Sequence, residues 1–404
     1  MRRTIHLALY GEIEHPKPEL DLAWNLFQSE ALTRLRDVSL SSTPSRFAPH
    51  GMAASRFEHS VGVSYLARKL CDWRSSLRDR RQLLIAAALC HDIGSPPFSH
   101  IAEIFMYDRL GRTHEEQTLR LLGPGTELSE LLRSYEVDPS EVLALIKGEH
   151  PELGPLIAGS IDLDNIDNSP HLLRSLGYSF ASYHPLRLIR AFRIRGGELS
   201  LDSSYLSEIL GWAECRRQLY DLLHSEPQLS SATMLYRALE FAYERGSLGR
   251  EFFEMGESEA LHHLRRQSGR KAGQLVQRAL NWRHYHLLYE QLNGEEDPRL
   301  AGLYQDWAER KRLCDRLAAE LKIADVDCAL YVGRDRGEKS IELPFSGERA
   351  ATVASLFANR SGPQRLAFFA AREHSELDPK RVEQAVQRAL EELPEASVPA
   401  HVFF

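Results

Sequence analysis

The sequence has few cysteines and no long hydrophobic run. Its five cysteines are scattered and never form a CxxC pair, which argues against a disulfide framework and predicts reduced thiols in the cytoplasm. The longest apolar run, residues 83–90, is far shorter than the roughly 20 residues of a membrane-spanning helix. His6 interrupts the apolar stretch at the N-terminus, so neither a membrane protein nor a secreted one is predicted.

The chain also lacks a strong excess of charge. Its 50 basic and 57 acidic residues give a net charge of −7, which disfavours general binding to nucleic acid but leaves a local basic patch open. No internal repeat and no glycine-rich phosphate-binding motif is present. With 404 residues, 43% hydrophobic and 26% charged, the composition is that of a globular protein of two or three domains of about 150 residues each.

Capping boxes and apolar repeats predict a mostly helical chain. Residues 55–58 and 113–116 each place a serine or threonine three positions before a glutamate, the pattern that begins a helix. A helix-like stretch covers residues 20–40. An alanine- and leucine-rich helix is expected over residues 81–90, ending by Gly94.

Short strands are predicted at two places only. Residues 192–195 and 198–201 alternate on both sides of Gly196-Gly197, which predicts a small β-hairpin. Helical periodicity returns over residues 204–291. Near the C-terminus, strands are expected at residues 328–332, 340–344 and 366–371, with a final helix through Leu393. We therefore predict a mainly α protein with a helical body over residues 1–315 and a small α+β region over residues 316–404.

Two histidines and two aspartates are candidates for a metal site. Pro155 is expected to open a helix that carries Asp164 inward, and a buried carboxylate needs a cation or a hydrogen-bonding partner. His59 lies in the first turns of the helix that follows residue 55, and His91-Asp92 end the helix over residues 81–90. Each residue alone is explained equally well as a hydrogen-bonded core residue. Together they form a mixed nitrogen and oxygen donor set suited to a divalent metal.

The text around these residues resembles a known family. Four motifs occur in the same order as in the HD-domain phosphohydrolase superfamily, and they most closely resemble its deoxynucleoside triphosphate triphosphohydrolase branch. These motifs are residues 34–36 with 56–63, residues 88–100, His114-Glu115 and residues 160–167. The resemblance runs from about residue 10 to 290. It implies a helical HD core with its metal centre in residues 50–180.

The resemblance also implies roles for individual residues. A divalent ion (Mn, Fe, Ni, Co, Zn or Mg) is held by His59, His91, Asp92 and Asp164. His100, oriented by Glu103, contacts a phosphate. His114, with Glu115 as its partner, protonates the leaving group, and Arg56 binds phosphate oxygens.

The resemblance fails at the positions that select the sugar in the family. Leu40 replaces a polar residue and Leu172 an acidic one, and both leucines are expected to face the ligand. Asn165 stands in place of a lysine or arginine that contacts phosphate, and Asn168 in place of a tyrosine. Ser169-Pro170 is expected to interrupt the helix there.

The implied function is metal-dependent hydrolysis of a nucleotide. The expected reaction cleaves a (deoxy)nucleoside triphosphate to the nucleoside and triphosphate in a cytoplasmic homo-oligomer. Two alternatives stay open: phosphomonoester or phosphodiester hydrolysis of another nucleotide or short nucleic acid, and a non-catalytic nucleotide sensor. A pure sensor needs no proton donor, so the candidate donor His114 favours an enzyme.

Overall fold

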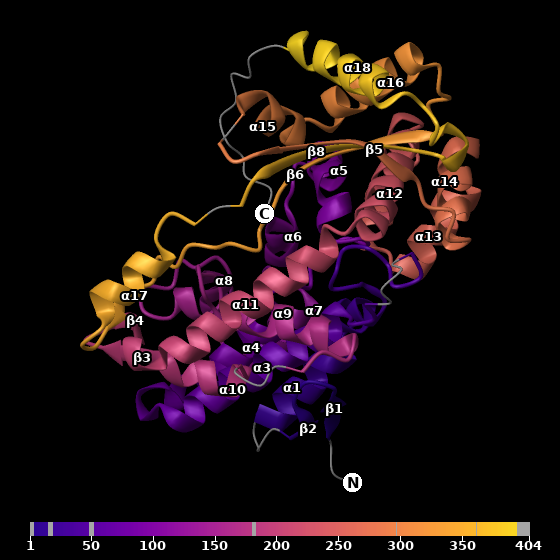
Figure 1. Ribbon diagram of the computed structural model, residues 1–404. Coiled ribbons are helices and arrows are strands. Elements are labelled where there is room, and N and C mark those ends of the chain that lie inside the picture. The colour runs from indigo at the N-terminus through magenta and orange to yellow at the C-terminus, as the bar shows by residue number, and fades with distance from the viewer. Residues whose placement is uncertain are drawn as a thin grey trace.

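The computed structural model describes residues 4–14, 19–47, 52–179, 183–295, 297–360 and 362–393. The fold is mainly α, as predicted (Figure 1). The helices of the N-terminal half are α1 (Glu19–Gln28), α2 (Glu30–Arg34), α3 (Arg56–Trp73), α4 (Arg81–Cys90), α5 (His100–Leu110), α6 (His114–Leu121), α7 (Glu127–Ser134), α8 (Pro139–Ile146), α9 (Leu163–Ser175) and α10 (Pro185–Leu188). Those that follow are α11 (Leu206–Leu223), α12 (Glu226–Glu244), α13 (Glu257–Arg266), α14 (Arg270–Leu280), α15 (Pro298–Gln305), α16 (Trp307–Leu321), α17 (Ala350–Phe357) and α18 (Pro379–Glu391).

Strands are short and form three small sheets in the described residues. The strands are β1 (Ile5–Leu7), β2 (Gly11–Ile13), β3 (Phe192–Arg195), β4 (Glu198–Asp202), β5 (His286–Asn293), β6 (Cys328–Arg334), β7 (Phe345–Ser346) and β8 (Gln364–Ala370). The predicted hairpin is confirmed as β3–β4, and β7 adds to β4 in parallel. None of the described helices combines the length and apolar character needed to span a membrane.

Both predicted capping boxes are confirmed. The Ser55 hydroxyl accepts the backbone N–H of Glu58 at the start of α3, and the Thr113 hydroxyl accepts that of Glu116 at the start of α6. In each box the glutamate carboxylate accepts the backbone N–H of the capping residue, so two otherwise unpaired backbone N–H groups are satisfied. These caps fix where α3 and α6 begin, and both helices carry candidate site residues in their first turns.

The core of the N-terminal half surrounds α3 and α4. Every residue of α4 from Leu83 to Cys90 is buried, which explains why the longest apolar run of the sequence has no polar face. Helix α3 packs against α4 and α9, and most of its residues are buried as well. The metal candidates therefore lie on helices whose positions are fixed by a shared hydrophobic core.

The C-terminal α+β region contains the sheet β5–β8–β6, which is antiparallel throughout. In Figure 1 helices α15, α16 and α18 cover one face of this sheet, and α12 lies on the other. The helical periodicity predicted up to residue 291 is wrong for β5, which pairs with β8 along its whole length. Because β5, α15 and α16 pack into this region, the domain boundary at residue 315 stays a prediction.

Three local predictions near α9 and β7 are wrong. Pro155 opens only a 3₁₀ turn, Gly154–Leu156, and α9 begins afresh because the Asp162 carboxylate accepts the backbone N–H of Asn165. Pro170 does not interrupt α9. Because proline has no backbone N–H, Pro170 cannot donate to the Ile166 carbonyl one turn earlier. That carbonyl accepts a hydrogen bond from the Tyr183 hydroxyl instead, at 2.8 Å. The strand expected at residues 340–344 is likewise displaced to β7.

A buried carboxylate on α13 fastens the segments that precede α3 and α5. Glu257 is 6% exposed and accepts hydrogen bonds from the backbone N–H and the hydroxyl of Ser39. Burial, the largest cause, raises the pKa of Glu257 to about 7 although these donors and the backbone N–H of Phe98 oppose the shift.

The raised pKa predicts that Glu257 makes the protein less stable as the pH rises. Between about pH 4.5 and 7 the folded state holds the proton more tightly than the unfolded state, so the free energy of unfolding falls across this window. In Glu257→Gln this contribution is absent. Urea unfolding of both proteins at pH 5 and pH 8 measures this. From pH 5 to pH 8 the free energy of unfolding of the wild type should fall by up to about 3 kcal/mol more than that of the variant. Parallel behaviour of the two proteins would contradict the assignment.

Candidate metal centre and active site

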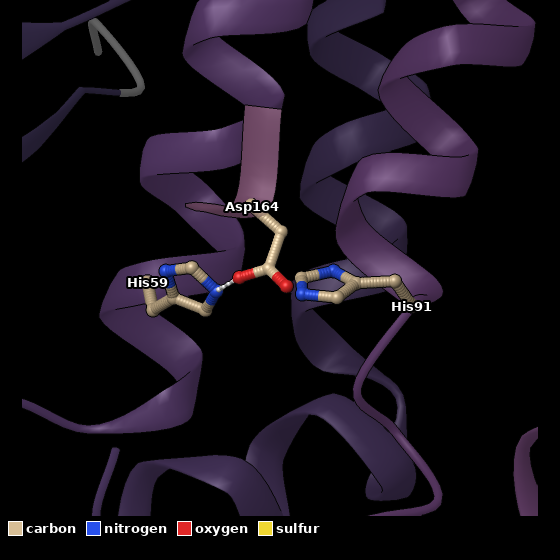
Figure 2. A group of neighbouring side chains, drawn as sticks. All are labelled: His59, His91 and Asp164. Atoms are coloured by element: carbon tan, nitrogen blue, oxygen red, sulfur yellow. Dashed lines mark ion pairs between the residues drawn. The ribbon is translucent and has the colours of Figure 1, made fainter. Parts of the chain in front are cut away.

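Two histidines and one aspartate from three helices meet at one point. His59 lies on α3, His91 caps the C-terminus of α4, and Asp164 lies in the first turn of α9. One potential ligand atom from each residue lies within 4.8 Å of the other two. Figure 2 shows the Asp164 carboxylate descending between the two imidazoles, one oxygen toward each ring. The structure thus brings together three of the four predicted metal ligands.

The hydrogen bonds of the two imidazoles leave the same nitrogen of each ring free. The Nδ1 atom of His59 lies 2.7 Å from an Asp167 oxygen, and that of His91 lies 2.8 Å from the Ala88 carbonyl. Both Nε2 atoms are buried and make no hydrogen bond to any described residue, although Asp164 Oδ1 approaches that of His59 to 2.9 Å. If both rings are neutral and donate through Nδ1, each Nε2 atom carries a lone pair that points toward the Asp164 carboxylate. Two imidazole nitrogens and one carboxylate form the donor set of a metal site.

The charge balance at His59 also fits a bound cation. Burial opposes protonation of this ring, but the close approach of the Asp164 carboxylate and the hydrogen-bonded Asp167 carboxylate outweigh it and raise the pKa of His59 to about 10. A site that stabilises a positive charge this strongly suits a divalent ion in place of the proton. Imidazole nitrogen with carboxylate oxygen matches the predicted list of metals and does not choose among them.

Asp167 is a residue of this site that the sequence reasoning missed. It is fully buried, and besides His59 it contacts His171 at 3.1 Å and accepts a hydrogen bond from the Tyr10 hydroxyl at 2.5 Å. A Cβ atom on residue 62 would lie 2.4 Å from an Asp167 oxygen, so glycine is required there. The signal was present in the spacing, because residues 164 and 167 share a helix face.

The fourth predicted ligand, Asp92, lies beside the cluster. Its Oδ2 is 3.4 Å from His91 Nε2 and accepts a hydrogen bond from the Arg56 guanidinium at 2.5 Å. Arg56 is itself buried and also donates to the Ser99 hydroxyl at 2.7 Å. Despite burial, the Arg56 charge, with those of nearby histidines, holds the pKa of Asp92 well below its usual range. Asp92 is therefore ionised, and its role as a ligand stays a prediction.

Backbone strain marks the turn before α5. Phe98 and Ser99 have positive φ angles of 64° and 49°, a conformation that costs about 1–3 kcal/mol for residues with a Cβ atom. Ser99 is held by the bond from Arg56 and by donating to the Ser39 carbonyl. These contacts stabilise a turn that aims His100, the next residue, out of the core.

A second cluster consists of His100, Glu103 and His114. One oxygen of Glu103 lies 3.2 Å from His100 Nδ1, and the other lies 2.5 Å from His114 Nδ1 and accepts the His114 backbone N–H. The carboxylate that contacts His114 is thus Glu103. The predicted partner, Glu115, is exposed and acts on His114 only through its charge.

Helix α6 is fixed directly to the turn after His91. A Cβ atom on Gly94 would lie 2.1 Å from the His114 carbonyl oxygen, so only glycine permits this approach. The Thr118 hydroxyl accepts the Gly94 backbone N–H at 3.0 Å and lies 3.4 Å from the His91 carbonyl. The metal cluster and the His114 cluster are therefore held at a constant separation.

These features define a mainly helical protein with a candidate metal centre of histidine and carboxylate donors. Residues 56–169 match the model of the HD domain family, and this span contains every site residue described so far except Tyr10, Ser39 and His171. Residues 56–169 of this chain therefore form an HD domain.

Individual relatives are distant in sequence. The chain is 30% identical over 228 residues to the uncharacterized protein YwfO of Bacillus subtilis, covering 53% of this chain and 50% of that protein. It is 31% identical over 185 residues to the deoxynucleoside triphosphate triphosphohydrolase SAMHD1 homolog of Dictyostelium discoideum, covering 41% and 35%. The chain thus spans half or less of these curated relatives.

Two solved structures share the fold over nearly the whole chain. A phosphohydrolase from Bacteroides thetaiotaomicron has a TM-score of 0.68 at 19% identity and covers 92% of this chain and 100% of its own. A hypothetical protein from Aquifex aeolicus has a TM-score of 0.69 at 20% identity, covering 96% and 99%. The C-terminal α+β region therefore belongs to the shared fold.

We predict that Asp164→Asn abolishes metal binding. The substitution keeps the side chain's shape but removes the charge shared by both imidazoles, so metal per chain should fall at least about tenfold. Asp92→Asn should also lose metal, because its carboxylate adjoins His91. Elemental analysis of purified proteins measures this, with Asp138→Asn as the control, since Asp138 caps α8 on the surface. Full occupancy in Asp164→Asn would mean that the ion binds elsewhere.

Proposed function

We propose that this protein is a metal-dependent phosphohydrolase that acts on a nucleotide. The observation that carries the proposal is the convergence of His59, His91 and Asp164, whose ligand atoms lie within 4.8 Å of one another. A divalent ion bound there supplies Lewis acidity toward a phosphate oxygen and makes water a stronger nucleophile. The HD domain of residues 56–169 supports the same reaction class.

His114 is the proposed proton donor to the leaving group. Burial opposes its protonation, but the charge and hydrogen bond of Glu103 prevail and raise the pKa of His114 to about 9. The ring therefore carries a proton at neutral pH, as a general acid must. Glu103 binds Nδ1 and leaves Nε2 as the atom that gives up the proton. His100, whose side chain is 47% exposed, is held by the same carboxylate and is the proposed phosphate contact.

The proposed substrate is a (deoxy)nucleoside triphosphate, cleaved to the nucleoside and triphosphate. Support comes from the similarity to the Dictyostelium deoxynucleoside triphosphate triphosphohydrolase SAMHD1 homolog and from the order of the four motifs. We further propose that the protein acts in the cytoplasm as a homo-oligomer; all five cysteines are buried and free, which is consistent with a reducing compartment.

The test is a screen of the metal-loaded protein against nucleoside triphosphates, nucleoside monophosphates and single-stranded oligonucleotides, with products resolved by mass. Release of nucleoside and triphosphate supports the proposal in full. Products from only the monophosphates or oligonucleotides would replace the substrate and keep the reaction class. No turnover by protein with full metal occupancy would contradict an enzyme and favour a nucleotide sensor.

We predict that His114→Ala keeps its metal but loses activity by about 10²–10⁴-fold, as expected when a general acid is removed. The loss should be much smaller for a nitrophenyl ester, because a nitrophenolate leaves without protonation. Metal content and steady-state rates on both substrates measure this, with His262→Ala, on the exposed side of α13, as the control. Equal losses on both substrates would show that His114 is structural.

A second prediction concerns the sugar. Leu40 and Leu172 were expected to face the ligand, but both lie in the hydrophobic core, 4% and 2% exposed. Neither offers a polar atom, and apolar contacts discriminate by only about 1–3 kcal/mol. We predict that kcat/KM differs less than about a hundredfold, or 2.7 kcal/mol, among the ribo, 2′-deoxy and 2′,3′-dideoxy forms of one triphosphate. Stronger selection would show that another residue contacts the sugar.

A further inference from the structure

A segment of the C-terminal region lies against the helices of the metal centre. Residues 335–344 connect β6 to β7. The Ser160 hydroxyl, just before α9, accepts the backbone N–H groups of Glu342 and Leu343 at 2.9 and 3.4 Å. On α11, the Arg216 guanidinium donates to the Arg336 carbonyl at 2.8 Å. The segment is therefore attached to both α9 and α11.

This segment carries a lysine to the residue next to a predicted metal ligand. Lys339 Nζ donates a hydrogen bond to the Asn165 side-chain oxygen at 3.1 Å, and the Arg216 guanidinium approaches the same oxygen at 3.4 Å. Asn165 directly follows Asp164 on α9. Two cations, one from α11 and one from the C-terminal region, thus meet beside the metal cluster.

Neither cation forms a direct ion pair with a carboxylate of the described residues. Lys339 makes no ion pair with any described residue, and its one hydrogen bond goes to a neutral amide. The acceptors of the Arg216 side chain are an amide, a backbone carbonyl and, at 3.5 Å, the Tyr220 hydroxyl, all uncharged. Arg216 is only 9% exposed. One buried and one half-buried positive charge that lie side by side, neither of them in a direct ion pair with a carboxylate, favour the binding of an anion.

The ionisation of Lys339 agrees with this imbalance. Burial lowers the pKa of Lys339, and so do the charges of Arg216 and Arg336. The charges of Asp162 and Asp164 oppose this shift only in part. The cation is thus under-stabilised in the protein alone. By contrast, the predicted phosphate ligand Arg56 is already paired with Asp92 at 2.5 Å.

We propose that Lys339 and Arg216 bind the phosphate chain of the substrate on the Asn165 side of the metal cluster, so that the C-terminal region contributes directly to the active site. Lys339 and Arg216 bond the same Asn165 oxygen, so they lie close enough together to bind neighbouring oxygens of one polyphosphate. Hydrogen bonds between charged groups are the strong ones. The inference rests on the proposed function, because it assigns the phosphate-binding residues of that same site.

The test measures binding without turnover. Inorganic tripolyphosphate is titrated calorimetrically into the metal-loaded, full-length wild type, Lys339→Met and Lys339→Arg. Lys380→Met, an exposed lysine on α18 of the same region, is the matched control. Loss of the charge should weaken binding about 10- to 100-fold, whereas Lys339→Arg and the control should stay within about threefold of wild type. Metal content, measured on each sample, shows that the fold is intact.

Kinetics separate this inference from the proposed function. Lys339→Met should raise KM for a triphosphate more than it lowers kcat, and should have little effect on a singly charged diester. Equal tripolyphosphate affinity in wild type and Lys339→Met, or no binding by wild type, would overturn the inference whatever the enzyme hydrolyses. Binding that depends on Lys339 in a protein that hydrolyses no phosphoester would overturn the proposed function and leave the inference standing.

Discussion

The site depends on one arrangement, in which the His59 ring lies between two carboxylates of α9. Asp164 faces Nε2 and Asp167 faces Nδ1, at 2.9 and 2.7 Å. This geometry requires α9 to lie close to α3, and Gly62 permits that approach because any side chain there would overlap Asp167. His171, one turn further along α9, and Tyr10, from the N-terminal segment, both contact Asp167. His91, opposite His59, can share a metal ion with Asp164 only when α9 holds Asp164 in this position.

Buried charge of this kind is unfavourable in the protein alone. Asp167 has histidine and tyrosine partners, but the side chain of Asp164 is 35% exposed and is bonded by no donor of proper geometry among the described residues. A cation shared by Asp164 and the two Nε2 atoms offsets this imbalance. The turn at Phe98 and Ser99 is a second unfavourable feature beside the site. Its positive φ angles cost stability, and the turn directly precedes His100.

The sequence was most informative where the determining interactions are local. The capping boxes at Ser55 and Thr113, the buried run in α4 and the Gly196-Gly197 hairpin depend on neighbours within a few residues, and all four predictions are confirmed. Three of the four predicted ligands also meet, although Asp164 was placed on the wrong helix stripe.

The predictions failed where a distant residue decides the outcome. Pro170 is tolerated within α9 because Tyr183 satisfies the carbonyl of Ile166, which no pattern within the helix shows. β5 forms because β8, more than 70 residues later, pairs with it. Glu103 replaces Glu115 as the partner of His114 because the turn after Gly94 brings α5 and α6 together. Each case is a tertiary contact overriding a local preference.

Helix α9 shows how one element serves two parts of the site. Residues 164, 167 and 171 recur at three and four positions and form a polar face toward α3, where they set the metal cluster. Asn165 is turned about 100° away from Asp164 and meets Arg216 of α11 and Lys339 of the C-terminal region. The hydrogen bonds of Arg216 and Lys339 to Asn165 therefore tie the two cations to the helix that carries Asp164. A shift of α9 would disturb both its metal ligand and its contacts with the cations. Gly62 and Tyr183, neither of them a proposed ligand, therefore constrain the whole site by fixing α9.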